Sequence, residues 1–360
     1  MSYGDPTQGY PWALPSSQAL PLLYHAYRRG INTWDTADVY SQGTSELLIA
    51  RAIKDYAIPR SRLVLLTKLY FGVDPEVVKS GETDFAMAMR NDGHMVNRVG
   101  LSRKHIFDAV EASVERLGTY IDVLQIHRLD SETPAEEVMR ALNDVVESGK
   151  VRYIGASSVS GLLGNVDLAI LMWVSQMAAW QLQMLNNVAE KHGWHRFIRY
   201  VVQHIERCER RHTNTEICSM QNYHNLIYRE EEREMHPYCD YAGIGLIPWS
   251  PLATGILARP WSEMGATKRA QLSQDLLAWM YSDADKVIVD RVEEVSKQLG
   301  QSMASVAIAW SLQKGVNPIL GLNSIERIDE AVGAVDLHLS KETVAALEEP
   351  YKTRPVAPMW

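Results

Sequence analysis

Three apolar, strand-like segments in the first third of the chain each lead into ionisable residues. Asp35 and Tyr40 follow the first segment, Lys68 ends the second and His127 ends the third. Taken singly, each of these residues is more often a turn, surface or core residue than a catalyst. The carboxyl ends of parallel strands meet at one rim of an α/β protein, and chemistry is concentrated there. We therefore expect the four side chains to converge at that rim.

The four side chains fit a site that protonates an oxygen atom. An unperturbed phenol has a pKa of about 10, so Tyr40 alone is a poor acid at neutral pH. The ammonium of Lys68 would lower the pKa of Tyr40, and Asp35 would hold Lys68 by an ion pair. His127 could hydrogen-bond a carbonyl oxygen beside Tyr40. No side chain donates hydride, so reduction at this site would require a nicotinamide.

The composition is that of an ordinary globular protein. The 360 residues are 46% hydrophobic and 22% charged, and the net charge of -8 argues against a general nucleic-acid binder. The sequence predicts no membrane span and no signal peptide. Three cysteines without paired spacing are expected to be reduced thiols in the cytoplasm. His204, Cys208 and His212 sit four residues apart, as metal ligands on a helix would, but a fourth ligand is lacking and we expect no metal.

Helix and strand signals alternate along the chain, which is typical of a parallel sheet. Gly30 and Gly149 are helix stops, and Thr133 would cap a helix whose first residue is Pro134. We count seven strand-like segments, near residues 31, 63, 121, 152, 219, 244 and 317. A closed (β/α)8 barrel needs eight strands. Because the chain begins one helix ahead of the Asp35 segment, the first strand is expected to precede Met1.

These segments resemble the aldo-keto reductases, particularly the aryl-alcohol dehydrogenase-like and versiconal hemiacetal acetate reductase-like members of fungal metabolism. The matching stretches are 32–40 with Gly43 and Glu46, 65–68, 120–130, 149–158, 221–229, 247–255 and 318–330. The resemblance implies one domain over residues 1–360, a (β/α)8 TIM barrel lacking its N-terminal hairpin and first strand. It also implies that the catalytic tetrad is Asp35, Tyr40, Lys68 and His127, the last binding substrate as well.

The resemblance further implies NADPH bound in an extended form. Family cofactor contacts fall on Asp35, Ser157, Ser158, Gln221, Trp249, Ser250, Leu252, Gly255, Gly321, Asn323, Ser324, Arg327 and Glu330. Trp249 would stack on the nicotinamide ring, although core packing is an equally good reading from sequence alone. Asn323 is neutral where the family often has Lys or Arg. The preference for NADP therefore rests partly on Arg327, and NAD remains an alternative.

An irregular insertion is expected after the fifth barrel strand, the segment near residue 152. The connection from there to Ser219 holds 62 residues, where a whole β/α unit averages about 30. Segments 159–176 and 199–218 account for the excess, because their removal leaves family-like junctions. Our hypothesis is that both are translated introns or a gene-model error. The alternative is a genuine two-part insertion that forms extra helices.

The resemblance implies a cytoplasmic, NADP-dependent oxidoreductase that reduces an aldehyde or ketone, either aromatic or an intermediate of secondary metabolism. Tyr40 would be the proton donor. Two alternatives stay open: a non-catalytic, NADP(H)-binding, redox-sensing regulatory subunit, and a defective truncated product. The partner is expected to be a small-molecule carbonyl compound rather than nucleic acid or a membrane, and the protein to be a monomer or weak homo-oligomer. Substrate specificity is expected in loops 71–100, 253–275 and 349–360.

Overall fold

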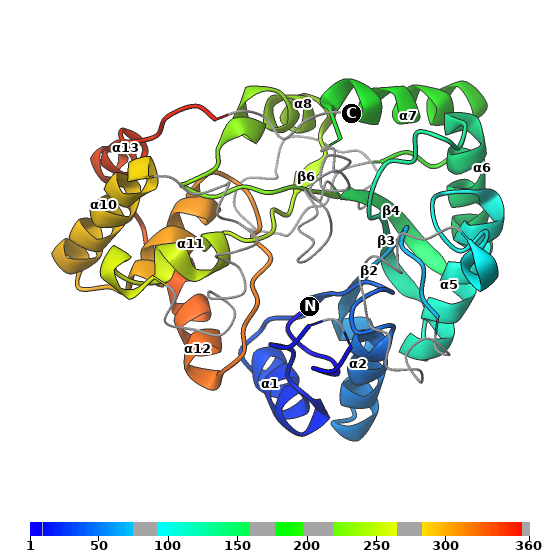
Figure 1. Ribbon diagram of the computed structural model, residues 1–360, viewed down its shortest axis with the longest axis horizontal. Coiled ribbons are helices and arrows are strands. Elements are labelled where there is room, and N and C mark those ends of the chain that lie inside the picture. Colours follow the sequence, from blue (N-terminus) through cyan, green and yellow to red (C-terminus); the bar gives the residue numbers. More distant parts are fainter. Residues whose placement is uncertain (9, 75–91, 158–176, 198–218, 265–282, 355–360) are drawn as a thin grey trace.

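A curved parallel sheet lies on the inside of the molecule and helices surround it (Figure 1). The computed structural model describes residues 1–8, 10–74, 92–157, 177–197, 219–264 and 283–354. Six strands pair in sequence order: β1 (Thr33–Asp35), β2 (Val64–Leu69), β3 (Ile121–Ile126), β4 (Val151–Ser157), β5 (Ser219–Gln221) and β6 (Gly245–Leu246). The α-helices are α1 (Ser16–Arg28), α2 (Thr44–Asp55), α5 (Arg103–Leu117), α6 (Ala135–Glu147), α7 (Ala179–His192), α8 (Met235–Ala242), α10 (Asp283–Leu299), α11 (Met303–Gln313), α12 (Ile325–Gly333) and α13 (Lys341–Glu348).

The sheet register brings the carboxyl ends of the strands to one edge. Asp35 pairs with Leu66 across β1 and β2, and Lys68 pairs with Gln125 across β2 and β3. Ser157 at the end of β4 pairs with Gln221 at the end of β5. Every pairing is parallel, as the alternation of helix and strand signals predicted. Polar residues from five neighbouring strands, β1 to β5, therefore lie at the same rim.

The main core fills the space between the sheet and the outer helices. Leu65 and Leu124 on the strands are almost wholly buried, as are Ile106 on α5, Leu142 on α6 and Leu182 on α7. Burial of large aliphatic side chains in this layer is the main stabilising contribution, roughly 1.5–3 kcal/mol for each. The helices are thereby fixed behind the strand ends that carry the polar residues.

Local sequence signals account for most helix boundaries. The Ser102 side chain accepts a hydrogen bond from the backbone N–H of His105 and caps α5, and Gly118 ends this helix with a φ of 66°. The prediction that Thr133 caps α6 was wrong. Pro134, with a ψ of 136°, occupies the N-cap, and the Thr133 hydroxyl one residue earlier donates to the Asp130 carboxylate at 2.6 Å, a charge-assisted hydrogen bond.

The seventh expected strand, near residue 317, forms only a short parallel pairing. The N–H of Asn317 donates to the carbonyl of Leu246 and that of Ile319 to the carbonyl of Pro248, at 2.9 and 2.8 Å. A single bridge joins Ile319 to Trp249. The described residues thus contribute six regular strands and this segment to a (β/α)8 barrel, and within them β1 pairs on one side only.

The first and last barrel helices complete the outer ring. Leu22 and Ala26 of α1 are buried against Ile328 of α12. Asp329 of α12 accepts from His25 Nε2 at 2.9 Å and forms an ion pair with Arg29, at the end of α1, at 2.8 Å. The ring of helices therefore joins residues near the start of the described chain to residues near its end.

Several expectations lie outside the described residues. These are the inserted segments 159–176 and 199–218, with His204, Cys208 and His212, and residues 75–91 of the loop 71–100 in which substrate specificity is expected. The helix α7, between the two inserted segments, is described but was not predicted from the sequence. None of the described helices combines the length and apolar character that crossing a membrane requires.

Candidate active site

A buried ion pair lies at the carboxyl edge of β1 and β2. Lys68 Nζ is 2.6 Å from Asp35 Oδ2 and also donates to the carbonyl of Thr36 at 2.8 Å. The Lys68 side chain is fully buried and that of Asp35 is 7% exposed. Burial lowers the pKa of Lys68, while the charge and hydrogen bond of Asp35 oppose this effect. The expected ion pair is therefore present.

The Tyr40 ring lies over this ion pair. Lys68 Nζ is 5.2 Å from the centre of the Tyr40 ring, and the tyrosine is 9% exposed. Burial raises the pKa of Tyr40 well above 10, and the carboxylates of Asp35 and Asp38 add to the rise. This result contradicts the expectation that Lys68 lowers the pKa, because desolvation of a phenolate outweighs the attraction of an ammonium that is already paired. Tyr40 is a neutral phenol in this site.

His127 completes the group at the end of β3. Its ring centre is 5.9 Å from that of Tyr40 in an edge-on arrangement. Burial lowers the pKa of His127 well below 6.5, and the charges of Lys68 and Arg128 act in the same direction, so the imidazole is neutral. Its Nδ1 is buried and has no hydrogen-bond partner among the described residues. The structure thus brings together the four residues expected at the rim.

Two glutamine side chains hold the other oxygen of Asp35. Gln125 Nε2 donates to Asp35 Oδ1 at 3.2 Å, and Gln221 Nε2 donates to the same oxygen at 3.0 Å. Gln125 was missed in the sequence, although its place in β3, two residues before His127, was a usable signal. Gln221 was expected to contact the cofactor; here it fixes a carboxylate of the site.

A second buried carboxylate organises the turn that carries Tyr40. Glu46 Oε1 accepts from the Thr67 hydroxyl at 2.6 Å, and Glu46 Oε2 accepts from Arg116 Nε at 2.6 Å. Thr36 also donates to Ser45 within this turn, at 2.9 Å. Glu46 is fully buried and so links the loop after β1 to β2 and α5. The first turn of α2, which follows the loop that carries Tyr40, is thereby tied to the neighbouring strand and helix.

The residues expected around the nicotinamide and pyrophosphate lie along strand ends and the loop after β6. Ser157 is buried and donates to the Gln221 carbonyl at 3.3 Å, while Ser158 lies outside the described residues. Trp249 is half-buried, with its ring centre 4.5 Å from that of Tyr223. The following loop contains positive φ values at residues expected near the pyrophosphate, namely Ser250 at 57° and Gly255 at 102°. Leu252, also expected there, is half-buried at the start of this turn.

The residues expected at the adenosine phosphate gather at the start of α12. Ser324 caps this helix by accepting from the N–H of Arg327, whose guanidinium donates to Asn323 Oδ1 at 2.5 Å. Gly321, Asn323 and Arg327 are exposed, and Glu330 is half-buried one turn along. A helix N-terminus with an exposed arginine suits a phosphate, because the free N–H groups and the guanidinium both favour anions.

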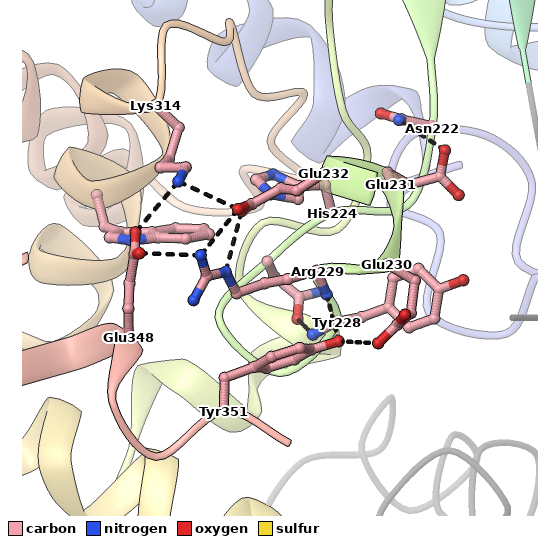
Figure 2. Close-up of polar contacts among 12 residues, drawn as sticks. Asn222, His224, Tyr228, Arg229, Glu230, Glu231, Glu232, Lys314, Glu348 and Tyr351 are labelled. Atoms are coloured by element: carbon pink, nitrogen blue, oxygen red, sulfur yellow. Dashed lines mark hydrogen bonds and ion pairs between the residues drawn. The ribbon is translucent and has the colours of Figure 1, made fainter. Parts of the chain in front are cut away.

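A charged network links the loop after β5 to the C-terminal helices. Sequence analysis did not predict this network. Figure 2 shows Arg229 and Lys314 between two carboxylates, Glu232 and Glu348. Arg229 binds Glu232 through two nitrogens, at 3.0 and 2.8 Å, and Glu348 at 2.9 Å. The buried His224 ring is 2.9 Å from Glu232. The network holds the loop that begins immediately after Gln221.

The curved parallel sheet and the ionisable group at its carboxyl edge define a barrel enzyme. The chain matches the Aldo/keto reductase family over residues 1–199 and 197–352. It is 52% identical over 363 residues to the versiconal hemiacetal acetate reductase of Aspergillus parasiticus, covering 99% of this chain and 93% of that protein. It is 46% identical over 359 residues to a Schizosaccharomyces pombe protein named "Putative aryl-alcohol dehydrogenase C977.14c" (99% and 92%). It is 42% identical to the aldo-keto reductase AMT2 of Alternaria alternata over 99% of this chain and 87% of that one.

The chain belongs to the aldo/keto reductase family. It is accordingly an oxidoreductase of carbonyl compounds, and the family generally uses a nicotinamide cofactor. The resemblance inferred from the sequence is confirmed, and with it the α/β-barrel fold class.

Proposed function

We propose that this protein is a cytoplasmic, NADPH-dependent reductase of aromatic aldehydes or ketones, with Tyr40 as proton donor. The single observation that carries the proposal is the buried pair of Lys68 and Asp35 beneath Tyr40, with the neutral His127 beside it. Paired burial of a lysine, a carboxylate, a phenol and an imidazole at one strand edge has no evident structural purpose.

The nicotinamide, when bound, supplies the hydride that reduces the carbonyl carbon. The protein supplies the proton and the electrostatic environment. A neutral Tyr40 donates a hydrogen bond to the carbonyl oxygen, and its proton transfers as that oxygen becomes an alkoxide, which is more basic than a phenolate. Lys68 stabilises the phenolate left behind, and His127 as a neutral imidazole holds the same oxygen. The raised pKa of Tyr40 keeps the proton in place until the alkoxide forms.

The residues present fit the expected cofactor. The Ser324-capped start of α12 and the exposed Arg327 would hold the adenosine phosphate, and Arg327 supports NADP over NAD. The half-buried Trp249 would offer one ring face to the nicotinamide, with Gln221 and Ser157 alongside. Ser158, Ser250, Leu252 and Gly255 complete the contacts that we propose.

The substrate proposal rests on a cluster of aromatic side chains around Tyr40. Tyr10 and Phe71 are buried in one cluster with Tyr40, and Trp12 and Tyr70 pack against it. Such surroundings favour a flat, apolar substrate body. We propose an aromatic carbonyl compound of secondary metabolism, a class consistent with the names of two similar relatives. We propose a monomer or weak homo-oligomer, since no partner surface is needed to complete the site.

The test is Tyr40→Phe assayed with a panel of aromatic aldehydes. We expect kcat to fall by about 10²- to 10⁴-fold, the contribution typical of a positioned acid. NADPH binding, measured by fluorescence titration, should be retained because the phenol oxygen is the only atom removed. Turnover equal to that of the parent protein would refute the assignment.

The same assay separates the alternatives. A parent protein that binds NADPH but turns over no carbonyl compound would indicate the redox-sensing subunit. Insoluble parent protein would indicate the defective product.

A further inference from the structure

Arg128 follows His127 at the carboxyl end of β3 and takes no part in the chemistry described above. Its side chain is buried, with 7% exposure. The Nε and NH2 nitrogens of its guanidinium are both buried and have no hydrogen-bond partner in the described part of the chain. Burying two nitrogens of a charged group in this way is costly, because they lose hydration without gaining an acceptor. By contrast, the half-buried Arg229 is bonded to two carboxylates.

Arg128 lies next to the site rather than behind it. Its Cζ is 5.0 Å from the centre of the Phe71 ring, and that ring centre is 5.1 Å from the ring of His127. Phe71 belongs to the same aromatic cluster as Tyr40. Burial chiefly lowers the pKa of His127, and the nearby charges of Lys68 and Arg128 act in the same direction. Burial lowers the pKa of Arg128 to about 10, so it remains a cation at neutral pH.

We propose that Arg128 binds a carboxylate of the substrate, so that the preferred substrates are aromatic carbonyl compounds that also carry an acidic group. This inference rests on the proposed function. The two unpartnered nitrogens point to an acceptor with two oxygens, because the guanidinium fork matches a carboxylate by two parallel hydrogen bonds. Phe71 and its neighbours would contact the aromatic body while Arg128 fixes the acid and His127 the reacting oxygen.

The first experiment compares 3- and 4-formylbenzoate with their methyl esters, which have the same ring and carbonyl but no charge. For at least one of the two positions, the parent protein should show a kcat/KM at least tenfold higher on the acid. Arg128→Met should lower kcat/KM on that acid by about 10- to 100-fold more than on its ester, the loss of a charge-assisted hydrogen bond. The kcat/KM of Arg128→Lys on that acid should lie between the values of the parent protein and of Arg128→Met. Lysine keeps the positive charge but cannot form the two parallel hydrogen bonds of a guanidinium.

Arg152→Met is the matched control. Arg152 is an exposed arginine whose guanidinium lies 4.3 Å from the centre of the Tyr120 ring, near the start of β4 and so at the opposite edge of the sheet. The substitution also removes an arginine beside an aromatic ring, but it should leave the ratio of kcat/KM on the acid to kcat/KM on the ester unchanged. Equal kcat/KM values on acid and ester at both ring positions in the parent protein would overturn the proposal. So would an Arg128→Met variant that loses activity on acid and ester to the same degree, which is the result expected of a purely structural arginine.

A binding measurement separates this proposal from the proposed function. Benzoate is titrated calorimetrically into the parent protein and into Arg128→Met, each with and without NADP+. A Kd at least tenfold weaker in the variant, with NADP+ binding retained, supports the carboxylate site even if no carbonyl compound is turned over. Equal benzoate affinity in the two proteins overturns it. If Arg128→Met fails to fold by circular dichroism, Arg128→Lys and the parent acid-to-ester ratio decide the question.

Discussion

The four residues proposed to act on the substrate depend on side chains to which we assign no chemistry. Asp35 is held by Lys68 on one oxygen and by Gln125 and Gln221 on the other. A carboxylate with three donors has no freedom to rotate, so the ammonium that it anchors is fixed beneath Tyr40. At the scale of the residue, the geometry of the site therefore depends on the glutamines of β3 and β5 as well as on the four residues of the tetrad.

Gln125→Met tests this support. The substitution keeps the side-chain length but removes one donor from a buried carboxylate, at a cost of about 1.5–3 kcal/mol in the free energy of unfolding. We also expect kcat to fall more than NADPH affinity, because Lys68 would be less well placed. Urea denaturation and steady-state kinetics provide the two measurements. Gln298→Met, at an exposed position of α10, is the control. A fully stable and active Gln125→Met would show that Gln221 suffices.

Glu231 gives a prediction with a defined pH range. Burial raises the pKa of this carboxyl from 4.5 to about 7, although Asn222 donates to it at 3.0 Å. The folded state prefers the protonated form, so stability is fully present below pH 4.5 and is lost as the pH rises to 7. Glu231→Gln removes the ionisation and keeps an acceptor for Asn222. Its unfolding free energy should exceed that of the parent by about 1 kcal/mol at pH 5 and roughly 3 kcal/mol at pH 8.

Denaturant titrations at the two pH values measure this difference, with Glu115→Gln as a control at an exposed position. A stability gain in Glu231→Gln that is the same at both pH values would mean that ionisation of Glu231 is not its cause.

At the scale of the element, Glu46 joins the first turn of α2 to β2 and α5. Glu46→Ala would leave Arg116 half-buried and without its carboxylate, which costs roughly 3–5 kcal/mol of stability when a buried pair is broken. We expect a lower melting temperature together with a reduced kcat, because α2 directly follows the loop that carries Tyr40. Glu46→Gln keeps an acceptor for Thr67 and should be intermediate on both measures. Equal melting temperatures for all three proteins would contradict the role given to Glu46.

The sequence predicted the order of elements well because periodicity and glycine stops are local signals. Gly149, predicted to stop a helix, follows α6 with a φ of 75°, and the assumption of parallel strands correctly brought the four rim residues together. Sequence reasoning failed where burial and side-chain geometry decide the outcome, because neither is a property of the local pattern. Thr133 donates its hydroxyl to Asp130, three residues earlier, instead of capping α6, and burial raises the pKa of Tyr40.

The same limit explains the charged network of Figure 2. Arg229 and Glu348 are 119 positions apart, and nothing in either local sequence indicates the other. Gln125 was overlooked for a related reason, since its partner Asp35 lies 90 positions away, although its place two residues before His127 was a usable signal. Long-range polar pairing thus marks the boundary of what a single sequence reveals about this site.

At the scale of the whole molecule, stability depends on the junction between α1 and α12. Ile328 is fully buried there, so Ile328→Ala should cost about 2–5 kcal/mol through lost burial and the cavity left behind. Thermal unfolding measures the loss. Ile325→Ala on the same helix removes an exposed side chain and serves as the control, with less than about 0.5 kcal/mol expected. Equal effects of the two substitutions would show that the junction contributes little.

That junction also has a consequence for biosynthesis. His25 and Asp329 are 304 positions apart, and domains emerge from the ribosome with their N-terminal residues first. Leu22 and Ala26 therefore lack their contact with the buried Ile328 side chain until that residue has been translated. Any product terminated before that point exposes an apolar stripe on α1, which makes nascent and prematurely stopped chains natural clients for chaperones.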